Sequence, residues 1–203
     1  GFRGPDIDYL KKQGVLPGLA AIIVGEDQAS KVYVKSKSKY FDNMGCYSET
    51  FCLGQESLEK DITNLIEQLN VDKKFHGILL QLPLPKEYDT KNILRRISPQ
   101  KDVDCFHIDN IGKLFSGIPL YIPCTPNGII KILEYYDIET SGKHAVIIGR
   151  SNIVGLPMFG LLAQKFKKGN ATVTMCNSRT PNIEDFTKQA DILIVAVGNP
   201  DIV

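Results

Sequence analysis

The segment 142–157 reads Gly-Lys-His-Ala-Val-Ile-Ile-Gly-Arg-Ser-Asn-Ile-Val-Gly-Leu-Pro, and it decides the fold of this chain. Its apolar run 145–148 predicts a buried parallel strand that Gly149 ends, and apolar residues at helical spacing from Val154 onward predict a helix. A strand, a glycine-bearing turn and a helix present backbone N–H groups and a positive helix terminus to a phosphate. The spacing Gly149-x5-Gly155 differs from G-x-G-x-x-G, so a tight turn without a ligand stays an alternative at this point.

The residues that follow the next strands indicate which dinucleotide such a turn would hold. The β-rich run 171–176 is followed by Ser178 and Arg179, where an NAD-binding protein usually has an Asp or Glu for the ribose 2′-hydroxyl. No acid stands there, and Arg150, Ser178 and Arg179 can make charge-assisted hydrogen bonds to a 2′-phosphate. A single arginine of this kind is more often a solvated loop cation. A third apolar run ends at Gly198, where a ligand could lie against the backbone. We therefore expect NADP as the cofactor.

Composition excludes several classes of protein. A net charge of +1 without a block of like charges gives no reason to expect nucleic acid. No apolar run approaches the roughly 20 residues of a membrane span, so we expect no membrane association. The odd number of cysteines, five, without CxxC spacing favours reduced thiols and a cytoplasmic location. The three histidines stand at no metal-ligand spacing, so we expect no metal. The chain lacks an initial Met and stops just after a predicted strand, so we expect truncation at both ends.

The first half of the chain offers candidate side chains on a helix and at a strand end. Ser30 is a plausible N-cap for a helix on which Tyr33 and Lys37, four residues apart, share one face. The apolar run 77–82 predicts a buried strand, and the polar Gln81 lies near its end. Because ligands of open α/β sheets bind beyond the carboxyl ends of strands, Gln81 is a candidate for ligand contact. A hydrogen bond from Gln81 to loop backbone is an equally good interpretation.

The alternation of strand and helix along the whole chain predicts an α/β protein. Ser57 is expected to cap a helix with a clear apolar stripe, and Thr125-Pro126 has the N-cap and proline pattern of another helix start. The loop 115–124, rich in Gly, Pro and Ser, is the best domain boundary. We therefore expect one domain over 1–122 and a Rossmann-like, doubly wound parallel sheet over 123–203.

Five pieces of this sequence, in this order, resemble the bifunctional methylenetetrahydrofolate dehydrogenase/cyclohydrolase family. They are Val-Gly-Glu-Asp-Gln-Ala-Ser-Lys-Val-Tyr-Val-Lys-Ser-Lys at 24–37, Gly-Ile-Leu-Leu-Gln-Leu-Pro-Leu-Pro at 77–85, Lys-Asp-Val-Asp at 101–104, Pro-Cys-Thr-Pro at 123–126 and Gly-Arg-Ser-Asn-Ile-Val-Gly at 149–155. Any one piece is a weak signal, but all five in this order are specific, and the match covers nearly the whole chain.

The resemblance implies two α/β domains with a folate cleft between them, and a homodimer formed through the nucleotide domain. It implies oxidation of 5,10-methylenetetrahydrofolate with NADP, then hydrolysis to 10-formyltetrahydrofolate, within one-carbon metabolism and purine biosynthesis. Tyr33 would stack on the folate rings, Lys37 would be the catalytic lysine oriented by Gln81, and Asp104 would hold the pterin edge. The implied substrate-binding residues are Ser30, Tyr33, Gln81, Leu82, Pro83 and Asp104. The implied cofactor-binding residues are Gly149, Arg150, Ser151, Val154, Gly155, Ser178, Arg179 and Gly198.

Two departures and two rivals accompany the resemblance. Cys105 stands where the family has Gly after Lys-Asp-Val-Asp, and in a positive-φ loop it would add strain of about 1–3 kcal/mol. The family's late glycine- and proline-rich folate loop has no counterpart before Val203. A non-catalytic folate or nucleotide sensor of the same fold is one alternative, favoured only by Cys105. A short-chain dehydrogenase is the other, since Tyr33-x3-Lys37 mimics its catalytic pair, but there the dinucleotide turn precedes the pair.

Overall fold

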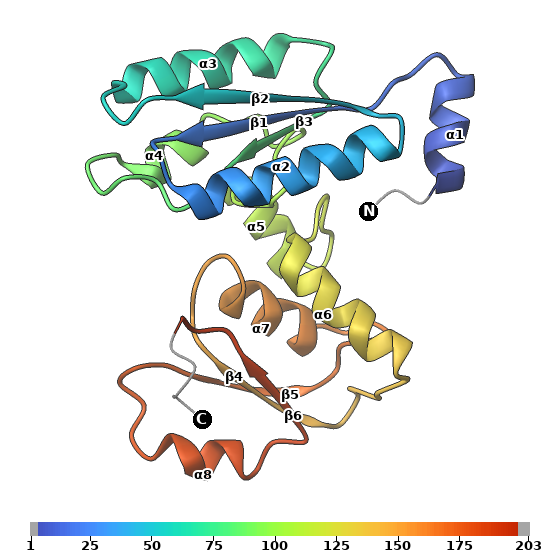
Figure 1. Cartoon of the computed structure of the whole chain (residues 1–203). Coiled ribbons are helices and arrows are strands. Elements are labelled where there is room, and N and C mark those ends of the chain that lie inside the picture. The colour runs from blue at the N-terminus through green and yellow to red at the C-terminus, as the bar shows by residue number, and fades with distance from the viewer. Residues whose placement is uncertain (1–3, 199–203) are drawn as a thin grey trace. The chain divides into compact units, whose positions relative to one another are not determined.

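A computed structural model describes residues 4–198 of the chain, apart from the side chains of residues 4, 5, 28–31 and 33. The chain folds into two compact units, Gly1–Val103 and Asp104–Val203, and each unit is an α/β structure with its own sheet (Figure 1). The mixed α/β fold with parallel strands agrees with the fold class expected from the alternating pattern.

The first unit is built on a parallel sheet with strand order β2-β1-β3. Its elements are α1 (Gly4–Lys12), β1 (Gly18–Val24), α2 (Gln28–Asn43), β2 (Tyr47–Leu53), α3 (Glu59–Val71), β3 (Gly77–Leu80) and α4 (Thr90–Leu94). Because side chains alternate along a strand, β1 contributes residues to a core on each face of the sheet. Ile22 packs with residues of α3 and α4, and Ile23 packs with Val34 of α2. Helices therefore cover both faces of this sheet (Figure 1).

The second unit has a parallel sheet with strand order β5-β4-β6. Its elements are α5 (Ile108–Phe115), α6 (Cys124–Tyr135), β4 (His144–Ile148), α7 (Gly155–Ala163), β5 (Thr172–Cys176), α8 (Ile183–Thr187) and β6 (Ile192–Val195). Ile147 of the central strand packs with α5, α6 and α7, whereas Val146 and Ile148 pack with α8 on the other face. This arrangement is the doubly wound parallel sheet that the sequence predicted.

Three helices begin earlier or later than their expected caps. Helix α2 begins at Gln28, so Ser30 lies inside it; Asp27, another residue type favoured at N-caps, directly precedes the helix. Helix α3 has Leu58 rather than Ser57 at its N-cap, and the Leu58 N–H donates to the Asp61 carboxylate (2.9 Å). Helix α6 begins at Cys124, one residue before the expected cap. Its Pro126 still lies in the first turn, where a missing N–H costs nothing.

The segment 104–122 lies in the second unit, although the composition of loop 115–124 predicted a boundary after residue 122. Helix α5, which was not predicted, packs against α7, and its Leu114 belongs to the core beneath β4. The Gln164 side chain donates a hydrogen bond to the carbonyl of Leu114 and fixes the end of α5. These contacts make α5 part of the second unit.

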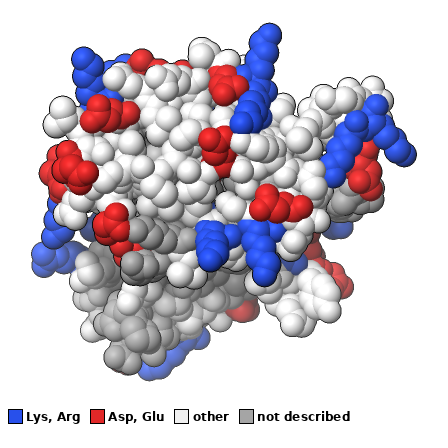
Figure 2. Space-filling model, turned by 45° about the horizontal axis from the view of Figure 1, so that its top comes forward, with Lys and Arg blue, Asp and Glu red and all other residues white. Residues whose placement is uncertain are grey.

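The face of the molecule shown in Figure 2 carries charged side chains of both signs. On the face shown in Figure 2, basic and acidic side chains of the described residues are interspersed, which agrees with the small net charge of +1. Among residues 4–198, no helix has the length and apolar character needed to cross a membrane.

Candidate functional site: a nucleotide turn and a set of polar side chains

The turn after β4 is shaped by two glycines. Gly149 has φ 113°, and its N–H donates to the carbonyl of Cys176 on the neighbouring strand (2.9 Å). Gly155 is the first residue of α7, and a Cβ there would overlap the carbonyl oxygen of Gly149. A Cβ on Gly149 would overlap the carbonyl oxygen of Ala196. Only glycine at both positions lets the chain turn this tightly between strand and helix.

The expected cofactor residues lie at the carboxyl ends of three neighbouring parallel strands. Gly149 follows β4, the turn 177–180 follows β5, and Gly198 closes the described chain after β6. Since parallel strands end at one edge of a sheet, the structure brings these residues to the same edge of the second unit. This edge is where open α/β sheets bind their ligands.

The turn after β5 presents its residues on a fixed backbone. The Asn177 side chain accepts from the Arg179 N–H (3.0 Å), and the Asn177 N–H donates to the Thr180 hydroxyl (2.9 Å). Ser178 and Arg179 between them are exposed. The organising role of Asn177 and Thr180 was not predicted, although Asn followed by a hydroxyl residue is a recognisable turn signal.

Charge at this edge suits a phosphate. Arg150 and Arg179 are exposed, and the described turns 149–154 and 177–180 contain no Asp or Glu. Ser151 is exposed too, and its Oγ accepts a hydrogen bond from the Val154 N–H (3.2 Å), so its hydroxyl proton can be donated to a ligand. Exposed guanidinium groups, a hydroxyl and glycine-shaped backbone together fit the cofactor that the sequence predicted, a dinucleotide with a 2′-phosphate.

In the first unit, helix α2 places Lys37 on the side that faces the sheet. Val34 is buried (1% exposed) and Phe41 packs on the same core, and Lys37 lies three residues after the one and four before the other. Lys37 is half-buried, whereas Lys35 and Lys39 on the same helix are exposed. A lysine in the inner stripe of a helix is unusual for packing alone. The side chains of Ser30 and Tyr33, also on α2, lie outside the described residues.

Gln81 directly follows β3 and is held by the strand and the loop at once. Its backbone N–H donates to the carbonyl of Ile22 (2.9 Å), and its Nε2 donates to the carbonyl of Leu82 (2.7 Å). The interpretation that Gln81 bonds loop backbone is therefore confirmed. That bond uses the amide nitrogen, so the amide oxygen can accept a hydrogen bond from another partner. Leu82 is half-buried and Pro83 is exposed at the same strand end.

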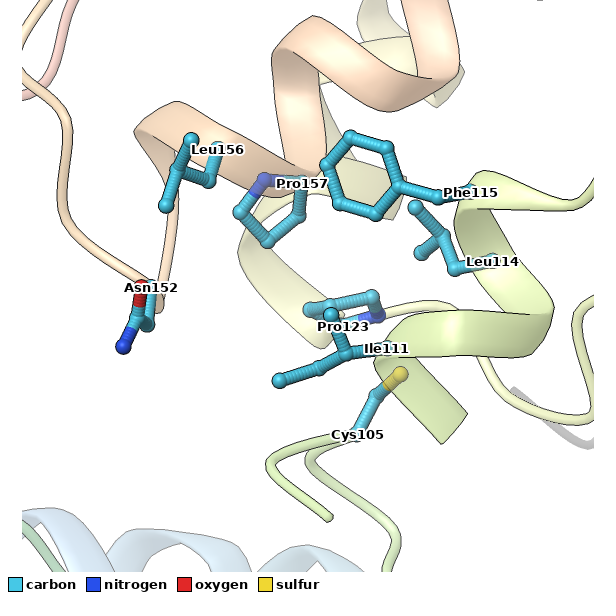
Figure 3. Close-up of a pocket in the computed structure, with 8 residues that line it drawn as sticks. All are labelled: Cys105, Ile111, Leu114, Phe115, Pro123, Asn152, Leu156 and Pro157. Atoms are coloured by element: carbon cyan, nitrogen blue, oxygen red, sulfur yellow. The ribbon is translucent and has the colours of Figure 1, made fainter. Parts of the chain in front are cut away.

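Asp104 lies half-buried in a turn, directly before a strained residue. Cys105 has φ 60° and a fully buried side chain, so the positive φ that made this substitution a concern is present. The thiol lines a small cavity of about 30 Å³ between α5 and the start of α7 (Figure 3). The other lining residues are Ile111, Leu114, Phe115, Pro123, Asn152, Leu156 and Pro157. Nothing in the local sequence pattern predicted this apolar cavity.

Metal binding has no structural support in the described part of the chain. Within residues 4–198, no cluster of three or more His, Cys, Asp or Glu side chains has a geometry that could hold a metal ion.

Comparison with known proteins assigns both halves of the chain. The catalytic-domain model of tetrahydrofolate dehydrogenase/cyclohydrolase matches residues 5–104, and the NAD(P)-binding-domain model of the same enzyme matches residues 123–203. The chain belongs to the tetrahydrofolate dehydrogenase/cyclohydrolase family. The catalytic-domain match contains Lys37 and Gln81, and the NAD(P)-binding match contains the two-glycine turn.

Individual family members are similar over nearly the whole chain. The bifunctional protein FolD of Bacillus cytotoxicus is 50% identical over 198 residues, which cover 98% of this chain and 68% of that protein. A crystal structure of bifunctional FolD from Campylobacter jejuni superposes with a TM-score of 0.93 at 42% identity, covering 98% of this chain and 70% of the other. The Trypanosoma brucei enzyme, in complex with NADP cofactor and an inhibitor, has a TM-score of 0.91 at 33% identity, covering 97% and 67%.

Proposed function

We propose that this chain oxidises 5,10-methylenetetrahydrofolate to 5,10-methenyltetrahydrofolate with NADP, and hydrolyses that product to 10-formyltetrahydrofolate. The observation that carries this function is the match of both enzyme domains, at 50% identity to a bifunctional relative over 98% of the chain. The two-glycine turn and the exposed arginines of the second unit support the choice of cofactor. The Trypanosoma brucei relative binds the same cofactor.

The second unit holds NADP, which accepts a hydride from the folate one-carbon bridge when it is bound. Backbone N–H groups of the turn from Gly149 to Gly155 hold the diphosphate together with Ser151, and Val154 packs beside them. Arg150, Ser178 and Arg179 hold the 2′-phosphate, because exposed guanidinium and hydroxyl donors replace the acid of NAD enzymes. Gly198, which follows β6, would leave the backbone there accessible to the cofactor.

The residues that bind the folate belong to the first unit, together with Asp104, which directly follows that unit in the chain. Tyr33 stacks on the pterin and benzoyl rings, an arrangement that aromatic side chains favour. Ser30, Leu82 and Pro83 line the same substrate. Asp104 accepts hydrogen bonds from the amino edge of the pterin, since an ionised carboxylate is an acceptor only.

The hydrolysis step needs proton transfers around one water. Water attacks the cationic one-carbon centre, and its proton passes to the Lys37 amine. Lys37 then returns this proton to N5 of the folate as the bond between N5 and the one-carbon unit breaks. The remaining hydroxyl proton is released as the formyl C=O forms, which gives 10-formyltetrahydrofolate and one released proton overall. Gln81, whose Nε2 is bonded to the carbonyl of Leu82, directs its amide oxygen at the Lys37 amine and orients it.

A direct assay tests the enzyme against the alternative of a non-catalytic sensor, which Cys105 alone favours. Purified protein is mixed with methylenetetrahydrofolate and NADP, and NADPH formation is followed by absorbance. We expect NADPH to appear only when both compounds are present, and reduction to be much slower when NAD replaces NADP. Tight binding of both compounds with no NADPH would establish the sensor instead.

Homodimer formation through the second unit and a role in purine biosynthesis stay predictions from the resemblance, and a cytoplasmic location stays a prediction from the five cysteines without CxxC spacing. Light scattering on the purified protein tests the first of these. A mass twice that of one chain is the expected result.

A further inference from the structure

The segment before Asp104 is tied to helix α3 by the side chain of Lys101. Its Nζ donates to the carbonyl of Leu69 (2.8 Å) and to the carbonyl of Asp72 (2.7 Å), both at the C-terminal end of α3. These carbonyls belong to the part of a helix that lacks intrahelical donors. Helix α3 has no basic residue in its own last turn. Lys101 therefore supplies, from 29 and 32 residues away, the cation that this helix end favours.

The Lys101 ammonium is partly buried, which has a cost in free energy. Burial lowers its pKa, and the nearby charge of Asp72 acts in the opposite direction. A lysine on an ordinary surface loop would keep its ammonium in water, where no such cost exists. The two carbonyl bonds offset this cost and hold the side chain in one geometry.

The backbone of the same segment is fixed to strand β3. The Ile78 N–H donates to the carbonyl of Lys101 (2.7 Å), and Asp102 forms a parallel bridge with Ile78. Val103 packs directly against Gly77, so closely that a Cβ on Gly77 would overlap a Val103 methyl group. Since the bridge is parallel, the segment runs in the direction of β3, toward the strand end that carries Gln81.

We propose that Lys101 is a positioning residue for Asp104: its ammonium, bonded to two carbonyls of α3, sets where the next turn delivers the carboxylate that recognises the pterin. This inference rests on the proposed role of Asp104. Without the ammonium, the carbonyls of Leu69 and Asp72 lose this donor, and the segment that precedes Asp104 loses its side-chain bonds to the end of α3. A displacement of about 1 Å at a binding group is enough to weaken substrate use strongly.

The test compares Lys101→Met with a matched control, Lys168→Met. Lys168 is a buried lysine (4% exposed) in the other unit, and its Nζ donates to the carbonyl of Ile138 (2.9 Å). Both variants should lower the melting temperature, because each removes an ammonium donor from backbone carbonyls. Only Lys101→Met should raise the KM for methylenetetrahydrofolate, by roughly ten- to a hundredfold, while the KM for NADP stays unchanged. Lys101→Arg should restore most of the loss, since a guanidinium can also donate to two carbonyls.

A second pair of variants separates this inference from the function on which it rests. Asp104→Asn should itself raise the KM for the folate. In an enzyme that already carries Asp104→Asn, Lys101→Met should raise this KM little further, because both changes act through one carboxylate. An Asp104→Asn enzyme with a normal KM would overturn the role of Asp104, and with it the inference. Two results would overturn the inference alone while Asp104→Asn is impaired. One is a normal KM for the folate in Lys101→Met, and the other is a double variant in which the two increases in KM simply combine. If Lys101→Met does not fold, Lys101→Gln, which keeps a neutral donor on a shorter side chain, is measured instead; it should raise the KM for the folate by a smaller factor, and an unchanged KM would overturn the inference.

Discussion

The two units of this protein share one strand order and use it for different chemistry. In each, the first strand is central, the second lies on one side and the third on the other, as β2-β1-β3 and as β5-β4-β6. Each central strand is followed by a glycine with positive φ, Gly25 (86°) in the first unit and Gly149 (113°) in the second. What differs is the space around that glycine. Among the described side chains, a Cβ on Gly25 would meet Pro85 alone, at 3.8 Å, whereas a Cβ on Gly149 would overlap backbone.

The difference shows that a parallel α/β sheet fixes where a ligand binds but not what binds it. The second unit packs its turn so closely that mainly backbone is presented there, which suits the proposed diphosphate with its need for N–H donors. The first unit leaves room after its central strand, and α2 instead offers side chains such as Lys37. Proton transfer needs such titratable side chains, so we propose that the hydrolytic step belongs to the first unit.

Lys37→Met is expected to have the largest effect, because it removes the side chain that transfers the proton in the proposed hydrolysis. Enzymatic hydrolysis of methenyltetrahydrofolate should fall by at least about a hundredfold, the usual contribution of a positioned acid–base group. Some dehydrogenase activity and folate binding should survive. The matched control is Lys35→Met, since Lys35 is exposed on the same helix. Near-normal hydrolysis in Lys37→Met, after subtraction of the spontaneous rate, would remove Lys37 from the mechanism and make Asp104 the next candidate.

Gly155→Ala and Gly25→Ala test the contrast between the two glycine turns. The added methyl group at Gly155 overlaps the carbonyl of Gly149, so the turn must open. We expect the KM for NADP to rise by more than roughly tenfold, the loss of one or more hydrogen bonds to a charged group. At Gly25 only the φ penalty applies, about 1–2 kcal/mol of stability, and cofactor binding should be normal. Equal effects on NADP binding in the two variants would contradict the contrast.

Arg150→Ala should change the choice of cofactor. Loss of charge-assisted hydrogen bonds worth about 1.5–3 kcal/mol weakens NADP binding by roughly ten- to a hundredfold. Binding of NAD, which lacks the 2′-phosphate, should change little. Arg95→Ala, at an exposed arginine of the first unit, serves as the control. If the KM values for NADP and NAD rise equally in Arg150→Ala, Arg150 does not recognise the 2′-phosphate.

Cys105→Gly should have the smallest effect. Glycine relieves the φ of 60°, about 1–2 kcal/mol, but it also removes a fully buried side chain worth about 1 kcal/mol of burial. The melting temperature should therefore stay within a few degrees. Because the residue directly follows Asp104, relief of strain there should raise kcat/KM for the folate by a fewfold. A decrease in kcat/KM would show that the thiol, rather than glycine, is the better residue at this position of this chain.

Local sequence patterns were sufficient for the parts of the fold that depend on local forces. The run 145–148, with Gly149 after it, predicted β4 and its turn because burial and the tight turn each demand particular residue types. Helix α5 was missed. Its apolar residues Ile108, Ile111, Leu114 and Phe115 do recur at helical spacing, but the helix has only eight residues and contains Gly112, a weak helix former, so the pattern is too short to predict it.

The contacts that position the candidate site could be predicted less well, because they join distant parts of the chain. Lys101 reaches Leu69 and Asp72, which lie 32 and 29 residues away, and no periodic pattern connects them. The bond from Gln81 to Leu82 is local, but a polar residue at a strand end fits either a ligand or a loop carbonyl. Only the folded arrangement showed that the amide nitrogen bonds the loop, which leaves the ligand role to the amide oxygen.

The central claim is that the first unit performs the hydrolysis and the second holds the nucleotide. One experiment tests it most directly: hydrolysis of methenyltetrahydrofolate in the absence of NADP, beside calorimetric titration of NADP, in Lys37→Met and Gly155→Ala. We predict that Lys37→Met loses hydrolysis and binds NADP normally, whereas Gly155→Ala hydrolyses normally and binds NADP weakly. Loss of hydrolysis in a folded Gly155→Ala enzyme, or of NADP binding in Lys37→Met, would contradict this division of roles.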